Sequence, residues 1–130
     1  FKIYIDDRSA FGYDRNIVLL INSGIGAYLL SSNISGVYPD TTNWVHLLFT
    51  YDQELSSNNY TLYVNNSSVG NGSKTANTPS TNDPSYNLQI GSNNATDSWD
   101  GKIAQVLIYN RVLSSSERGD LYNSGNGIAY

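Results

Sequence analysis

The chain has 130 residues, of which 39% are apolar, so it is long enough for one domain around a single core. Its net charge of -4 and its lack of any Lys/Arg cluster argue against a nucleic-acid-binding surface. No apolar run approaches the roughly 20 residues that span a bilayer. Because there is no cysteine, disulfides, a thiolate nucleophile and a cysteine zinc site are all excluded.

The composition predicts an all-β domain. Gly, Asn and Ser are abundant, whereas Glu occurs only twice. Such a composition suits short strands joined by many turns better than it suits helices.

The first third of the chain predicts three strands. Phe1–Asp6 alternates apolar and polar residues, as in a half-buried strand. Asn16–Ile21 and Ile25–Leu30 are apolar runs separated by Asn22–Gly24, whose residue types favour a hairpin turn with positive φ.

The central third predicts a second hairpin. A strand follows Trp44, and pleat parity places four of its apolar residues on one face: Val45, Leu47, Phe49 and Tyr51. The next strand directs Leu62 and Val64 inward, and Asn65-Asn66 forms its turn because Asn tolerates the left-handed region. Ser67–Ser85 is polar and is predicted as a long loop.

The last predicted strand, Lys102–Tyr109, is rich in β-branched and aromatic residues. Pleat parity places Val106 and Ile108 in the core and Leu107 and Tyr109 on the outer face.

A short helix is predicted to follow. Ser114, Ser115 or Ser116 can serve as its N-cap, with Glu117 in the first turn near the positive end of the helix dipole. Gly125 is placed to end it.

Four segments together resemble a known family. Asn43–Asp52 opens with a Trp and ends in Tyr-Asp, Tyr60–Asn66 contains Leu-Tyr-Val, Asn87–Gly91 ends in Ile-Gly, and Trp99–Gly125 contains Gly-Lys-Ile and Tyr-Asn-Arg-Val-Leu-Ser. In this order they resemble the laminin-G-like, concanavalin A-like jelly-roll domains. The resemblance implies an antiparallel two-sheet jelly-roll sandwich with one short C-terminal helix, as a single domain over residues 1–130.

In one respect the sequence departs from this family. The family has a further strand before the one that Phe1–Asp6 supplies, commonly beside the C-terminal strand. We therefore expect the domain to be excised from a longer chain. We also expect the edge near Leu107 and Tyr109 to contact preceding sequence or a neighbouring subunit, although exposed apolar residues are also ordinary.

The carboxylates argue against catalysis. Glycoside hydrolases of the fold that the chain resembles share a Glu-x-Asp-x-Glu motif on one strand. Two carboxylates of this motif act as the nucleophile and the general acid. Glu54 and Glu117 are the only glutamates, and neither lies in such a motif. The sole histidine, His46, has no nucleophile placed by motif and is predicted to be a surface residue. We expect a non-enzyme.

An oxygen-rich loop precedes the last strand. Asn93, Asn94, Asp97 and Asp100 offer the oxygen ligands that Ca²⁺ prefers, and members of the family that the chain resembles bind Ca²⁺ at a sandwich rim. Turn formation, with Trp99 packing under the loop, explains the same residues equally well.

Two functions remain open. A glycan-binding module would use Tyr63 and Trp99 against a sugar ring and Asn94 for hydroxyls. A structural subunit-contact domain of a particle or filament would bind no small ligand. Six Asn-x-Ser/Thr sequons point to an extracellular or virion surface, although so much Asn and Ser also produces sequons by chance.

Overall fold

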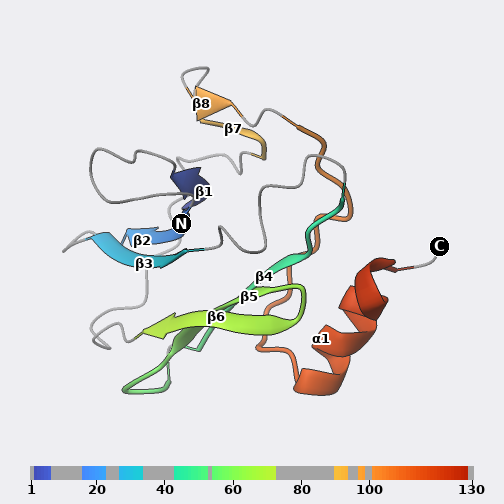
Figure 1. Ribbon diagram of the computed structural model, residues 1–130. Coiled ribbons are helices and arrows are strands. Elements are labelled where there is room, and N and C mark those ends of the chain that lie inside the picture. The colour runs from blue at the N-terminus through green and yellow to red at the C-terminus, as the bar shows by residue number, and fades with distance from the viewer. Residues whose placement is uncertain are drawn as a thin grey trace.

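The computed structural model is β-rich and ends in one helix (Figure 1). It describes residues 2–6, 16–22, 27–33, 43–52, 54–72, 90–93, 97–98 and 101–128, with backbone pairing alone for the strands between 2 and 33 and between 92 and 98.

The first sheet has three antiparallel strands. Strands β1 (Lys2–Asp6), β2 (Asn16–Asn22) and β3 (Ala27–Asn33) lie in the order β1-β2-β3. Both pairings are in continuous register, with Ile3 opposite Leu19 and Leu19 opposite Leu30. The predicted N-terminal strand and the predicted hairpin after it are confirmed.

The second sheet is the hairpin region predicted around Asn65-Asn66. Strands β4 (Leu47–Tyr51), β5 (Tyr60–Val64) and β6 (Ser67–Gly72) are antiparallel in the order β4-β5-β6. Asn65 and Asn66 have φ of 48° and 63°, which is the left-handed pair that a two-residue type I′ turn needs. The predicted turn is therefore confirmed.

Strand β6 replaces the beginning of the predicted loop. Its backbone pairs with β5 from Val64 opposite Ser67 to Tyr60 opposite Gly72, with an irregularity at Leu62/Tyr63. Gly72 is needed at its end, because a Cβ there would collide with the Tyr60 ring. The rest of the predicted loop, residues 73–85, lies outside the described residues.

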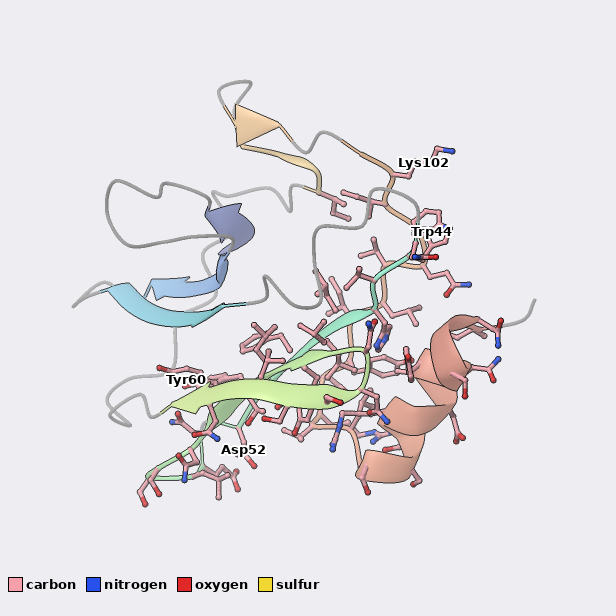
Figure 2. All side chains as sticks on the ribbon, in the orientation of Figure 1. Trp44, Asp52, Tyr60 and Lys102 are labelled. Carbon is pink, nitrogen blue, oxygen red and sulfur yellow. The ribbon has the colours of Figure 1, made fainter. Side chains whose placement is uncertain are left out.

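The core of the second sheet lies on one face. Tyr60, Leu62 and Val64 are 6%, 0% and 2% exposed. Five partly buried residues pack against them: Val45, Leu47, Phe49, Tyr51 and Val69. Figure 2 shows Tyr60 at the end of the β4–β5 pair opposite Trp44. The predicted inward residues of both strands are confirmed.

Helix α1 (Ser115–Tyr122) begins with a capping box. The Ser114 Oγ accepts from the Glu117 N–H, while the Glu117 carboxylate accepts from the Ser114 N–H. The helix ends earlier than predicted, because Asn123 adopts the left-handed conformation (φ 44°). Gly125 instead closes the 3₁₀ turn η2 (Asn123–Gly125), with φ of 92°.

The predicted last strand is wrong for this structure. Residues 102–109 form no strand with any described residue, and Val106 and Ile108 are 50% and 68% exposed rather than in the core. Gln105 has φ of 53°, which breaks the extended, alternating geometry. The Gln105 side chain holds the C-terminal segment, because it donates to the Ile128 carbonyl at 2.9 Å and accepts from the Ile128 N–H at 3.2 Å.

Two short strands, β7 (Ser92–Asn93) and β8 (Asp97–Ser98), form a separate pair. In the predicted Ile-Gly strand, Ile90 and Gly91 are bends and residues 87–89 lie outside the described residues. Strand β3 passes close to β6, but the described strands of the two larger sheets are not hydrogen-bonded to each other. The jelly-roll sandwich stays a prediction.

Candidate functional site

Helix α1 packs against the face of the second sheet that is opposite the core. The Arg118 guanidinium carbon lies 4.3 Å from the centre of the Tyr63 ring, a cation–π contact. The Tyr122 ring centre lies 5.8 Å from that of His46. Tyr63 alternates in the strand with Leu62 and Val64, so its side chain points to the other face. Both faces of β5 are therefore used in packing.

His46 was expected on the surface but is half-buried under this helix. Its backbone N–H donates to the Asn65 Oδ1 at 3.0 Å, and its carbonyl accepts from the Asn65 N–H at 2.9 Å. Its Nδ1 is buried and has no hydrogen-bond partner among the described residues. Burial lowers the pKa of His46, so the ring is neutral at neutral pH.

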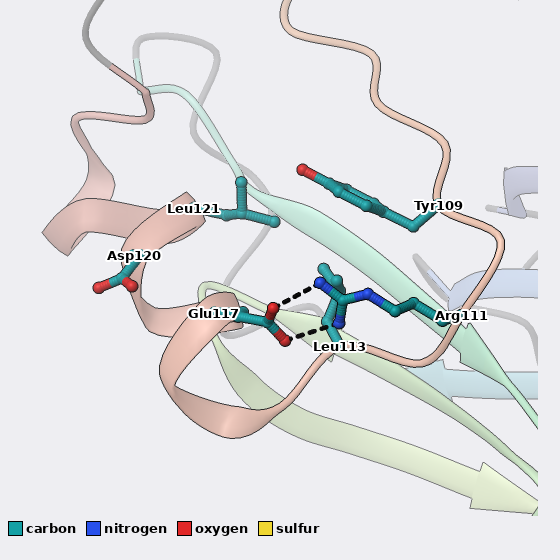
Figure 3. Close-up of a pocket in the computed structure, with 6 residues that line it drawn as sticks. All are labelled: Tyr109, Arg111, Leu113, Glu117, Asp120 and Leu121. Carbon is teal, nitrogen blue, oxygen red and sulfur yellow. Dashed lines mark hydrogen bonds and ion pairs between the residues drawn. The ribbon is translucent and has the colours of Figure 1, made fainter.

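A pocket of about 200 Å³ lies between α1 and the preceding segment, residues 109–113 (Figure 3). Six residues line it: Tyr109, Arg111, Leu113, Glu117, Asp120 and Leu121. Leu113 is only 6% exposed, whereas Tyr109 is 45% exposed. The Tyr109 ring lies across from Leu121 and next to the Arg111–Glu117 pair, whereas Asp120 lies at the margin with its carboxylate pointing away from the ring. The pocket therefore combines an accessible aromatic ring, leucine side chains and a charged rim.

The ion pair at this rim is also part of the helix cap. Arg111 Nη1 donates to Glu117 Oε2 at 2.9 Å, and Arg111 Nη2 donates to Oε1 at 2.5 Å. Glu117 Oε2 also accepts from the Ser114 N–H at 2.8 Å and from the Ser114 hydroxyl at 2.9 Å. The two-point contact fixes the plane of the guanidinium relative to the helix.

This network sets the charge of Glu117. Hydrogen bonds from Arg111, then from Ser114, lower the pKa of Glu117 to about 2. A general acid requires the opposite shift, toward or above neutral pH. Glu117 therefore serves as a fixed anion that orients Arg111. By contrast, no hydrogen bond or ion pair joins the Asp120 carboxylate to another described side chain.

Three of the residues predicted from sequence for ligand binding or contact are described in full. Tyr63 lies on β5, with its ring against Arg118. Leu107 and Tyr109 are 44% and 45% exposed. The structure brings Tyr109 into the pocket, whereas Leu107 does not line it.

The predicted calcium loop is described in part. Asn93 and Asp97 are opposite each other in the β7–β8 pair, so the backbone brings these two positions together. Asn94, Trp99 and Asp100 lie outside the described residues. Among the side chains that are described, no group of three or more His, Asp or Glu residues forms a metal-binding cluster.

Arg111 and Asp120 were not predicted as site residues from the sequence. A signal was nevertheless available, since the Ser114–Glu117 spacing predicts a capping box and a cation shortly before it can reach the Glu117 carboxylate.

The fold and the pocket define a class: an antiparallel β domain whose C-terminal helix packs on a sheet and carries an open, polar-rimmed pocket. A laminin-G family model, described as the concanavalin A-like lectin/glucanases superfamily, matches residues 4–117. The match covers most of the chain, and the chain therefore belongs to this family, as its motifs predicted. The comparisons with curated proteins and with solved structures gave no significant match.

Within the described part of the chain, α1 is far shorter than a membrane-crossing helix, and no other helix meets that requirement.

Proposed function

We propose that this domain is a non-catalytic surface module of a virion or extracellular assembly and that it recognises glycans. Membership in a superfamily that includes lectins supports this proposal. The observation that carries it is the pocket, where an accessible Tyr109 ring stands beside the Arg111 guanidinium that Glu117 fixes, with Asp120 at the margin. Sugars are bound by this combination, because a ring covers their apolar face while polar groups hold their hydroxyls.

Further residues belong to the proposal. Tyr63 lies on β5 with its ring against Arg118 of α1, and Trp99 and Asn94 remain candidates for a second part of the binding surface. We propose that Asn93, Asp97 and Asp100 bind Ca²⁺, since the β7–β8 pairing brings Asn93 and Asp97 together.

A non-catalytic role is proposed although the family includes glucanases. Retaining and inverting glycosidases need two carboxylates across the scissile bond, one of them with a raised pKa. The pKa of Glu117 is lowered to about 2, and Glu54 is exposed with its N–H bonded to Asp52. A panel of polysaccharides should show no hydrolysis, and Glu54→Gln should change nothing. Hydrolysis that Glu54→Gln abolishes would contradict this.

A glycan array with and without Ca²⁺ tests the proposal. Tyr109→Ala should abolish binding to whichever glycan the wild-type domain retains. Trp44→Ala is the matched control, because Trp44 is 60% exposed and does not line the pocket. If no glycan is retained under either condition, glycan recognition is wrong.

The exposed apolar residues favour a second candidate, a subunit-contact domain. We define the apolar strip by the following residues between positions 103 and 112, which are 41–68% exposed: Ile103, Val106, Leu107, Ile108, Tyr109 and Val112. Such contiguous apolar surface marks contact sites. Sedimentation velocity should show self-association or binding to the parent assembly, and Val106→Asp should weaken it. Because Val106 is half-exposed, we expect this variant to stay folded, unlike a charge placed in a core.

The proposed surface location rests on fewer sequons than the sequence suggests. Asn59 is 3% exposed and its Nδ2 donates to the Leu55 carbonyl, so it has a structural role. Asn65 accepts from the His46 N–H. Asn71 on β6 is exposed and fits a glycosylated position.

A further inference from the structure

We infer that the pocket beside α1 selects uncharged saccharides over acidic ones. This rests on the proposed glycan recognition and specifies its ligand class. The charged residues that line the pocket are Arg111, Glu117 and Asp120, so their formal charges of +1, -1 and -1 sum to -1. The whole chain is also negative, with a net charge of -4. An acidic sugar would approach a negative pocket on a negative domain.

Arg111, the only cation among the described residues that line the pocket, is already paired with an anion. Each of the two terminal nitrogens of Arg111 donates one N–H to the Glu117 carboxylate. A sugar carboxylate could take the place of Glu117 on these nitrogens only by displacing a side chain that is also held by the Ser114 N–H and hydroxyl. Displacement would therefore open the capping box of α1 as well as the ion pair. The positive charge of Arg111 is therefore already balanced, so the guanidinium attracts a second carboxylate less strongly than an unpaired guanidinium would.

An uncharged sugar does not compete for these bonds. A guanidinium has five N–H groups, and three remain on Arg111 after the two to Glu117. These can donate to hydroxyl or ring oxygens, and the Asp120 carboxylate, which points outward at the margin, can accept from a hydroxyl of a sugar unit that extends past the pocket. The Tyr109 ring and the side chains of Leu113 and Leu121 offer apolar surface to the C–H face of the sugar.

The size of the pocket limits what enters. About 200 Å³ equals roughly seven water molecules at about 30 Å³ each. It is below the roughly 300–1,000 Å³ of sites for larger organic ligands. One sugar ring at a time fits this space, either a terminal residue or one unit of a longer chain.

Matched glycan pairs test the selectivity. The wild-type domain is titrated with a galactose-terminated oligosaccharide, with a glucose oligomer, and with the sialylated and uronate-containing counterparts. We expect the acidic member of each pair to bind at least tenfold more weakly at low salt. The ratio should shrink at high salt, which screens charge.

Charge variants separate the pocket from the domain as a whole. Asp120→Asn should reduce the neutral-to-acidic ratio, and adding Glu117→Gln should reduce it further by freeing Arg111. Glu54→Gln removes the same charge elsewhere on an exposed residue and should leave the ratio unchanged. Circular dichroism checks that α1 is retained, and Asp120→Asn alone carries the test where the double variant loses the helix.

Equal or tighter binding of the acidic members would overturn the inference. So would a ratio that Asp120→Asn does not change. Glycan binding that Tyr109→Ala leaves intact would overturn the assignment to this pocket while leaving glycan recognition standing. Absence of binding to every glycan would instead overturn the proposed function.

Discussion

Truncating Leu62 to alanine should cost about 3 to 4 kcal/mol of unfolding free energy. Leu62 is 0% exposed at the centre of the core of the second sheet. The change removes three carbons, worth about 2.4 kcal/mol at about 0.8 kcal/mol each. A residual cavity adds to this, because Tyr60 and Val64 are held in β5 and cannot fill the space, and measured Leu→Ala costs span roughly 2–5 kcal/mol.

Urea denaturation followed by tryptophan fluorescence measures this cost. With a slope near 2 kcal/mol per molar, the midpoint should fall by about 1.5 to 2 M. Leu55→Ala is the matched control, because Leu55 is 48% exposed and should lose less than about 0.5 kcal/mol. Equal midpoints for the two variants, or a loss below about 1 kcal/mol at Leu62, would refute the placement of the core in this sheet.

Two further predictions concern the C-terminal region. The pKa of Glu117 is lowered to about 2 from 4.5, so its stabilising contribution is complete above pH 4.5 and is lost as the pH falls toward 2; the melting difference between wild type and Glu117→Gln should shrink over that range, and a constant difference would contradict it. Gly127→Ala should cost about 1–3 kcal/mol by thermal melting, because Gly127 has φ of 66° and a Cβ there would collide with the Gln105 amide. In a Gln105→Ala background the cost should fall to the backbone part alone, and an unchanged cost would place the clash elsewhere.

The second sheet could be predicted from the sequence because its local signals agree. Alternation placed Leu62 and Val64 inward, and Asn65-Asn66 supplied a type I′ turn, which matches the twist of the flanking strands. The start of the helix was predicted to within three serines, and the structure identifies Ser114 as the N-cap through its capping box with Glu117.

The errors arose where tertiary contacts decide. Residues 102–109 have strong β propensity, but a strand also needs a partner, and the left-handed Gln105 is held instead by Ile128. His46 alternates onto the outer face as predicted, yet no sequence pattern says that Tyr122 from the terminal helix will cover that face.

The pocket was only half predictable. Tyr109 was singled out from the sequence as a residue of a contact edge; it is 45% exposed, and its role in an interface stays a prediction. Arg111 and Asp120 could not be recognised as pocket residues from the sequence. They come near Tyr109 only because the chain turns at Ser114 and α1 folds back beside residues 109–113.

All six residues that line the pocket come from one continuous stretch, positions 109–121. None is supplied by β4, β5 or β6, whose core is built from other residues. If the pocket binds glycans as proposed, the residues that set ligand preference are separate from those that stabilise the sheets, except at Leu113, which is buried, and at Glu117, which also caps the helix. A relative could acquire a different ligand preference by substitutions within positions 109–121 alone, while its sheets stay unchanged. Ser114 and Glu117 would have to be retained, because they start the helix.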